Sequence, residues 1–228
     1  LDGRAVINGE RVAARSGQSF DCISPVDGRI LAQVARSSEA DVDAAVSAAR
    51  AAFEDRRWSG LAPAQRKRIM IKFADLLLAH ADELAITETL DMGKPVKYAR
   101  AVDVNSASNC IRWYGEAVDK VYDEIAPTSR NALALITREP VGVVGVIVPW
   151  NYPMIMASWK IAPALAAGNS VVLKPSEKSP LTALRMADLA LQAGIPAGVF
   201  NVVPGHGAEA GSPLALHMDV DCIAFTGS

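Results

Sequence analysis

Residues 141–153 decide the fold of this chain: Val141-Gly142-Val143-Val144-Gly145-Val146-Ile147-Val148 is followed by Pro149-Trp150-Asn151-Tyr152-Pro153. The apolar run has no charge and no alternation of apolar and polar side chains, which is typical of a strand covered on both faces in a parallel sheet. Pro153 suits the first position of a helix, where a missing N–H costs nothing. We therefore predict a central strand, a tight turn that carries Asn151, and a helix.

The chain after this turn repeats the same pattern. The sequence predicts helices over residues 153–167 and 179–193, strands over residues 170–173, 199–203 and 222–225, and a short helix after the glycines at 205–211. Strands separated by helix-length intervals indicate βαβ crossovers. We predict an α/β fold with a Rossmann-like parallel sheet and flanking helices. Open sheets of this kind bind ligands beyond the carboxyl ends of their strands, so the Asn151 turn is a candidate ligand site.

Two β-ribbons and several helices are expected before this sheet. Asn8-Gly9 lies between two short β-prone runs and is a strong hairpin signal. Residues 20–24 and 29–35 flank the turn-forming segment 25–28 and predict a second ribbon. Apolar residues at helical spacing predict helices that begin near Ser38, Pro63 and Asp82, and a longer helix over residues 96–121.

Residues 122–125 and 133–138 have the composition of two strands joined by a polar turn. A hairpin that interrupts an α/β chain typically projects outward and pairs with another subunit. We therefore expect a homo-oligomer, either a dimer or a tetramer, with residues 122–140 in its interface.

The composition favours small-molecule chemistry. Half of the 228 residues are hydrophobic and the formal net charge is −2, so there is no basic field to bind nucleic acid. The three cysteines are odd in number and far apart, and they form no familiar zinc spacing with the three histidines, which excludes a disulfide scaffold and the usual zinc motifs and fits a reducing cytoplasm. The most apolar window, residues 154–173, contains Lys160 and Pro163 and does not predict a membrane span.

The segment Gly205-His206-Gly207-Ala208-Glu209-Ala210 matches the dinucleotide fingerprint G-x-G-x-x-G/A between a predicted strand and a predicted helix. A preceding proline and the lack of an acidic residue at a strand end about twenty positions further on depart from that pattern. The alternative is a tight turn that needs two glycines for steric reasons.

Lys174-Pro175-Ser176-Glu177 follows the neighbouring strand. A lysine and a glutamate at the carboxyl edge of a parallel sheet can hydrogen-bond vicinal hydroxyls such as those of an adenosine ribose. The Glu177 carboxylate would also repel a 2′-phosphate, which predicts NAD rather than NADP. A solvated Lys/Glu pair on a loop is the alternative.

Four motifs, taken in this order, resemble the NAD(P)-dependent aldehyde dehydrogenase superfamily: residues 149–153, residues 162–169, residues 174–177 and residues 225–228. The resemblance covers nearly the whole chain. It implies a cofactor domain related to the Rossmann fold, with the cofactor along Ile147, Val148, Pro149 and Trp150. It also implies that Lys174 and Glu177 hold the adenosine ribose, that the adenine lies near the helix that carries Gly207 and Gly211, and that Ser228 caps a helix facing the pyrophosphate. Ser176, Phe225, Thr226 and Gly227 are expected to bind the cofactor as well.

The resemblance gives Asn151 a catalytic role. Its amide would donate a hydrogen bond to the aldehyde oxygen as negative charge develops there, an interaction whose loss typically costs about 3 kcal/mol in the barrier. Without the flanking motifs, a turn-stabilising amide would be the first interpretation of Asn151.

The family's general-base glutamate and nucleophilic cysteine lie C-terminal to residue 228, so we expect these residues alone to bind a dinucleotide and not to oxidise an aldehyde. The expected division is residues 1–121 as ribbons and helices of the cofactor domain, 122–140 as the oligomerisation hairpin and 141–228 as NAD-binding βαβ units, with the catalytic domain absent. A non-catalytic dinucleotide-binding or interaction module is the competing function.

Within the family, residues 111–122 and 177–180 are most similar to the ω-amino-aldehyde branch, which includes γ-glutamyl-γ-aminobutyraldehyde dehydrogenases. In that setting Asp103, Tyr152 and Trp159 would face the substrate tunnel. A carboxylate and aromatic faces suit a substrate that carries an ammonium group. A surface acid and core aromatic residues are the alternative.

Overall fold

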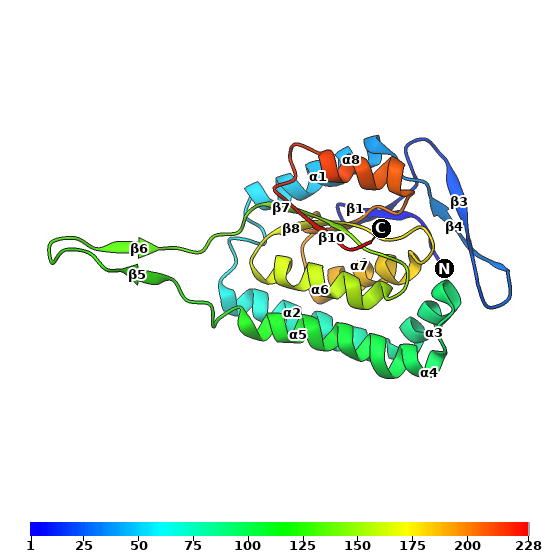
Figure 1. The fold of residues 1–228 in the computed structure, drawn as a ribbon, viewed down its shortest axis with the longest axis horizontal. Helices are drawn as coiled ribbons and strands as arrows, with labels where there is room; N and C mark the ends of the chain where they lie inside the picture. The colour runs from blue at the N-terminus through cyan, green and yellow to red at the C-terminus, as the bar shows by residue number, and fades with distance from the viewer. Residues whose placement is uncertain (228) are drawn as a thin grey trace.

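A mixed six-stranded sheet lies at the centre of the computed structural model, which describes residues 1–227 (Figure 1). Ser228, with its expected helix-capping role, lies outside the described residues. The strand order is β10-β7-β8-β9-β1-β2. The predicted parallel sheet is confirmed for the four strands β7 (Val143–Ile147), β8 (Ser170–Lys174), β9 (Phe200–Val202) and β10 (Cys222–Phe225).

The first predicted ribbon is not separate from this sheet. Its strands, β1 (Ala5–Ile7) and β2 (Glu10–Val12), form the antiparallel edge, with Val6 opposite Val202. The backbone N–H of Asn8 donates to Asn201 Oδ1 at 2.9 Å, which ties the hairpin turn to β9. The second ribbon, β3 (Ser19–Ile23) and β4 (Ile30–Ala35), does form a two-stranded sheet of its own, as predicted.

Strand β7 is shorter than the predicted run of residues 141–148, because Gly142 has φ +131° and turns the chain into the strand. The strand is covered on both faces, as expected. Val144 and Val146 pack with β8 residues on one side of the sheet, whereas Val143 packs on the other. It lies between β10 and β8, parallel to both.

Helices cover both faces of the sheet (Figure 1). On one face lie α6 (Pro153–Ala166) and α7 (Leu181–Ala193), with α2 (Pro63–Ala79) and α5 (Asn105–Ala117) packed beneath them as a further layer. On the other face lie α1 (Glu39–Glu54) and α8 (Ser212–Leu216). The start of α1 at Ser38 is confirmed by the capping interaction in which the Ser38 N–H donates to Asp41 Oδ2 at 2.8 Å.

The predicted single helix over residues 96–121 is wrong in two respects. It begins as α4 (Val96–Tyr98), continues as a π-helical segment, η1 (Ala99–Val104), and ends with α5 at Ala117. Single π turns inside helices frequently occur at functional sites, because they redirect the side chains that follow. Helix α3 (Ala81–Met92) precedes this region and ends at Gly93, whose φ of +84° is typical of a C-terminal glycine.

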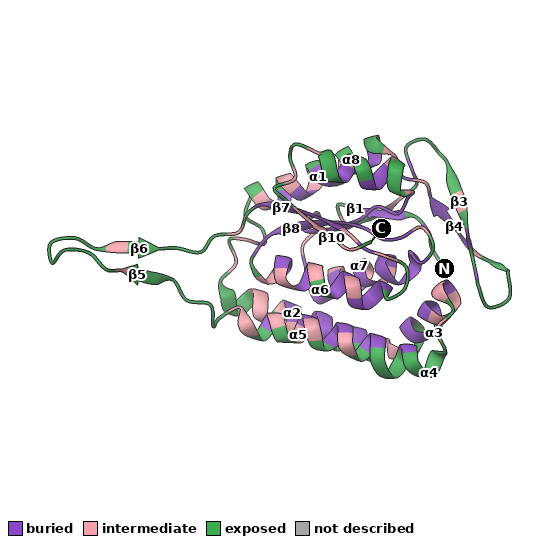
Figure 2. Cartoon of the chain, viewed as in Figure 1, coloured by how far each residue is buried: buried purple, intermediate pink, exposed green. Residues whose placement is uncertain are grey.

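A hairpin, β5 (Glu124–Ala126) and β6 (Ala134–Ile136), projects from the body of the chain (Figure 1). Its strands are shorter than predicted, and most of it is exposed (Figure 2). Apolar side chains are among the exposed ones, including Ile125 at 71% and Leu135 at 62%. Exposed apolar residues on a projecting two-stranded ribbon are a feature of interaction surfaces.

Glu88, on α3, is a buried acid in the core next to α7. Its side chain is fully buried, and neither carboxylate oxygen has a hydrogen-bond partner within residues 1–227. Burial raises the pKa of Glu88 to about 8, so the folded protein holds this carboxyl in its protonated form at neutral pH.

A substitution at Gly142 tests whether the backbone turn before β7 requires glycine. A Cβ at this position would lie 2.0 Å from Asp221 Oδ2, and φ is +131°. We expect Gly142→Ala to lower the free energy of unfolding of the full-length protein by roughly 3 kcal/mol, because strain and overpacking add. Gly17→Ala is the matched control, with φ +70° and no atom within 4 Å of the added carbon; it should cost only ~1 kcal/mol. Equal losses in urea unfolding would contradict this account.

Glu88 makes stability depend on pH in a predictable direction. Because its folded pKa lies above the value of 4.5 expected in the unfolded chain, its stabilising effect is complete at low pH and is lost as pH rises toward 8. We expect the thermal unfolding midpoint of Glu88→Gln to decrease less than that of the wild type as pH rises from 4.5 toward 8. Glu83→Gln is a control of opposite sign, since Arg185 holds the pKa of Glu83 below its usual value and its contribution is lost as pH falls. An unchanged slope in Glu88→Gln would argue against a buried, protonated Glu88.

Candidate functional site

The predicted site residues meet at the carboxyl edge of the parallel strands. Ile147 at the end of β7 lies opposite both Phe225 of β10 and Lys174 of β8. Leu173 of β8 pairs with Val202 of β9 in the same register. The four segments that follow these strands therefore leave the sheet at one edge, where open α/β sheets bind ligands. They carry residues 148–152, 175–179, 203–207 and 226–227.

The turn after β7 is tied to the turn after β8. The Val148 N–H donates to the Lys174 carbonyl at 3.2 Å, and the Ser179 hydroxyl donates to the Trp150 carbonyl at 3.1 Å. Pro149 lies between these two anchors and is partly buried. Helix α6 begins directly afterwards, with the Met156 N–H donating to the Tyr152 carbonyl at 2.9 Å.

Asn151 is exposed at the top of this turn. Among the residues that the structure describes, no hydrogen bond to its side-chain amide is present, so the two amide donors are free to meet a ligand. The interpretation of Asn151 as an amide that stabilises its own turn has no contact to support it.

Lys174 and Glu177 form an ion pair at the edge, with Nζ and Oε2 3.4 Å apart. Lys174 is almost fully buried, at 3% exposure, and burial lowers its pKa although Glu177 partly offsets the effect. Glu177 is only partly buried and can accept hydrogen bonds from a ligand. The Ser176 hydroxyl accepts from the Lys178 N–H at 3.3 Å and so shapes this loop.

The glycine-rich segment forms a π-helical turn, η2 (Gly207–Gly211), before α8. A Cβ on Gly205 would come within 2.8 Å of the Ser37 carbonyl, so packing requires that glycine. A Cβ on Gly207 would meet no atom within 4 Å, so no described neighbour requires glycine there, and a close ligand approach is a use for it. A Cβ on Gly211 would make only ordinary contacts, 3.9 Å from Lys174 Cδ and 4.0 Å from Ile147 Cδ1, and an Arg36–Glu209 ion pair holds the turn from outside.

Lys160 also lies at this edge, although the sequence patterns did not predict it as a site residue. It lies on α6, and its ammonium donates to the Thr226 hydroxyl at 2.7 Å, just past the end of β10. Burial lowers the pKa of Lys160. The available signal was a lysine inside the most apolar window of the chain. Phe225 and Gly227, on either side of Thr226, are exposed at this edge.

The residues expected to line a substrate tunnel differ in how far they are buried. Tyr152 and Trp159 are 43% and 56% exposed, but Asp103 is fully buried. Both Asp103 oxygens accept from the Lys94 ammonium, at 2.8 and 2.7 Å. Within the described residues Asp103 does not present a free carboxylate toward a tunnel, because its side chain is buried and paired with Lys94.

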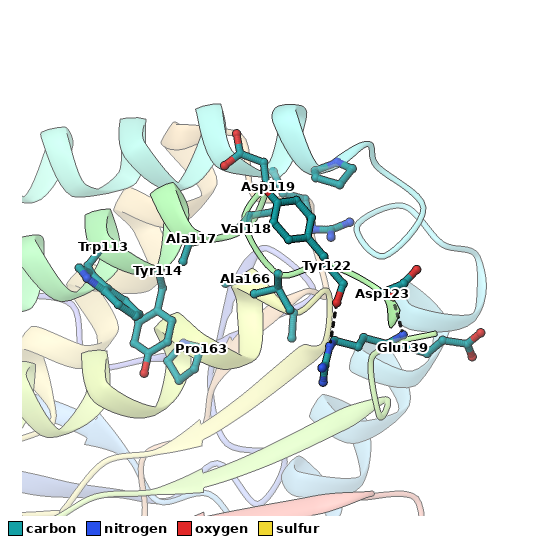
Figure 3. Close-up of a pocket in the computed structure, with 15 residues that line it drawn as sticks. Trp113, Tyr114, Ala117, Val118, Asp119, Tyr122, Asp123, Glu139, Pro163 and Ala166 are labelled. Carbon is teal, nitrogen blue, oxygen red and sulfur yellow. Dashed lines mark hydrogen bonds between the residues drawn. The ribbon is translucent and has the colours of Figure 1, made fainter. Parts of the chain in front are cut away.

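Two cavities lie at opposite edges of the sheet, and only one of them is beside the predicted site. One, of about 470 Å³, is lined by Trp150, Glu177 and His206 together with Phe20 and Met92, and adjoins the predicted site. The other, of about 720 Å³, lies at the root of the projecting hairpin, at the C-terminal end of α6 and so at the opposite edge of the sheet. There the rings of Trp113 and Tyr114 lie on one side and Tyr122 on the other (Figure 3). No predicted site residue lines this larger cavity.

Within residues 1–227, no group of three or more His, Cys, Asp and Glu side chains could hold a metal ion. None of the helices over the same residues is both long and apolar enough to cross a lipid bilayer.

Comparison with known proteins identifies the family. The model of the aldehyde dehydrogenase family matches residues 12–228. The chain is 55% identical, over its whole length, to the NADP/NAD-dependent aldehyde dehydrogenase PuuC of Escherichia coli (strain K12), of which it covers 46%. The chain thus spans about half the length of this relative.

Solved structures agree with this match. An indole-3-acetaldehyde dehydrogenase of P. syringae in complex with NAD⁺ and IAA superposes with a TM-score of 0.99 at 61% identity. A γ-glutamyl-γ-aminobutyraldehyde dehydrogenase of Burkholderia cenocepacia J2315 gives a TM-score of 0.98 at 60% identity. In both cases all of this chain and 46% of the other chain are covered. The family match, these identities and the shared fold show that the chain belongs to the aldehyde dehydrogenase family.

Proposed function

We propose that the full-length protein oxidises an aldehyde to a carboxylate with NAD⁺ and that the described residues supply the cofactor-binding half of its site. In balance, aldehyde, water and NAD⁺ give carboxylate, NADH and two protons. The observation that carries the proposal is the convergence of a free amide, a Lys–Glu pair and an open glycine-rich turn at one sheet edge. Family membership and the relatives' names support it.

The residues present fit a dinucleotide. Lys174 can donate and Glu177 can accept hydrogen bonds, which matches the two neighbouring hydroxyls of a ribose. Ile147, Val148, Pro149 and Trp150 offer an apolar edge beside them, and Ser176, Gly207 and Gly211 border the same edge. Phe225, Thr226 and Gly227 complete it from β10. A bound dinucleotide supplies the hydride acceptor for the reaction.

The catalytic contribution of the described chain is the Asn151 amide. A nucleophile outside the described residues would add to the aldehyde carbon, and negative charge would develop on the carbonyl oxygen. Asn151 donates a hydrogen bond to that oxygen from a turn anchored at Val148 and Trp150. Because the anchors hold the amide in place beforehand, the hydrogen bond forms without reorganisation in the transition state.

The cofactor choice follows from charge. The Glu177 carboxylate lies at the ribose position and would repel a 2′-phosphate, which favours NAD over NADP. Lys174 next to it reduces this repulsion and explains how a relative named as NADP/NAD-dependent is compatible with the same arrangement.

The hairpin over residues 122–140 serves, in this proposal, as the surface on which a homo-oligomer assembles. Its exposed apolar side chains, including Ile125 and Leu135, support this role. Three free cysteines support a reducing compartment, and we place the protein in the cytoplasm. The aldehyde is the substrate class; the named relatives act on both indole-bearing and amino-bearing types, so identity alone does not select one.

Replacing Asn151 tests the catalytic proposal. In the full-length protein, Asn151→Ala should lower kcat for an aldehyde by roughly 100- to 1,000-fold and leave NAD⁺ binding unchanged, because one oxyanion donor is lost. Gln18→Ala, which removes an exposed amide outside residues 122–140, is the matched control and should retain the wild-type rate. NADH absorbance with a panel of aldehydes measures both. A wild-type protein that binds NAD⁺ but turns over no aldehyde would favour the non-catalytic module instead.

Replacing Glu177 tests the cofactor preference. Glu177→Gln should raise kcat/KM for NADP⁺ relative to NAD⁺ by roughly tenfold, since a like-charge repulsion of at least ~1.4 kcal/mol is removed. Glu209→Gln makes the same change in charge nearby, but Glu209 is paired with Arg36 and should leave the ratio within about twofold. Equal ratios in wild type and Glu177→Gln would exclude Glu177 as the discriminating group.

A further inference from the structure

Lys94 lies next to the turn that carries Asn151, in contact with Tyr152. It follows Gly93 at the end of α3, and only 15% of its side chain is exposed. Asp103 reaches it from η1, the π-helical segment between α4 and α5. Both carboxylate oxygens of Asp103 accept from the Lys94 ammonium, so the buried carboxylate and the ammonium neutralise each other.

The Lys94 ammonium also contacts Tyr152. Nζ lies 3.9 Å from the centroid of the Tyr152 ring, within the range of a cation–π interaction. Tyr152 is the residue after Asn151 and the last before α6. An attraction that fixes the Tyr152 ring therefore restrains the backbone of the turn on the side opposite its anchors at Val148 and Trp150.

The same three groups have a second consequence. A carboxylate and an aromatic face are the features that would bind the ammonium group of a cationic substrate. Here the protein's own lysine fills that arrangement. A second ammonium at this place would find both Asp103 oxygens engaged and would be repelled by Lys94.

We propose that Lys94, held by Asp103, is a positioning residue that fixes the Tyr152 ring beside Asn151 and occupies the place where an amino-aldehyde's ammonium group would otherwise bind. This inference rests on the proposed function for its kinetic consequences. Its structural content, a cation site that Lys94 fills, can be tested without catalysis.

The kinetic test uses butanal and 3-aminopropanal, which differ as methyl against ammonium, on the full-length protein. In Lys94→Ala, kcat/KM for 3-aminopropanal relative to butanal should rise at least tenfold. The kcat for butanal should fall at least fivefold with KM for NAD⁺ unchanged, because the turn is less restrained. Lys94→Arg, which keeps the cation, and Lys94→Ala/Asp103→Asn, which removes the vacated carboxylate, should both return the ratio to within about threefold of wild type. A ratio that is the same in all variants would overturn the proposal.

A second measurement is independent of activity. Methylammonium chloride, compared with sodium chloride at equal ionic strength, should raise the thermal unfolding midpoint of Lys94→Ala by several degrees. It should not do so for wild type, where Lys94 fills the site, or for Lys94→Ala/Asp103→Asn, where the carboxylate is gone. Absence of a methylammonium effect on the cooperative unfolding transition of Lys94→Ala would overturn the proposal. A wild type without activity on any aldehyde would instead remove the proposed function and leave this result decisive.

Discussion

The parallel pairing of β7 with β8 is the interaction on which the rest of the structure depends. Both strands are buried on two faces, so a slip of one residue would turn Val144 and Val146 toward the wrong helix layer. Burial therefore fixes the register that places Ile147 opposite Lys174. Every group of the proposed site follows a strand end whose position is set in this way. The chemistry at the edge is thus determined by apolar packing inside the sheet.

The turns at the edge are held by polar contacts that continue the sheet beyond its last residues. The Val148 N–H and the Trp150 carbonyl both hydrogen-bond to the neighbouring segment. Lys174 shows the electrostatic result: its stem is buried in the core, while its ammonium reaches Glu177 at the surface. A ligand would meet groups that are already oriented, which lowers the entropic cost of binding.

Local patterns predicted the parts of the site that follow directly from a strand or open a helix. Asn151 and the Lys174–Glu177 pair were found because each comes after an apolar run, and α6 was found because Pro153 marks its start. Contacts between distant segments were not found. Lys160 meets Thr226 across 66 positions, and β1 joins β9 through a pairing that no local pattern specifies. The π turn η1, from which the buried Asp103 meets Lys94, was also not found, and the substrate-facing carboxylate was implied only by the family resemblance.

The buried Lys94–Asp103 pair is better explained by orientation than by stability. Taking both charges out of water costs about as much as their attraction returns, so apolar residues of similar volume would serve the core at least as well. What apolar residues cannot supply is a cation 3.9 Å from the Tyr152 ring, next to the amide that is proposed to meet the substrate. A directed contact at that position selects one ring orientation among several that packing alone would permit. The free-energy cost of burying the pair is then the cost of holding the turn in a single conformation. The substrate would bind to a turn that already has this conformation.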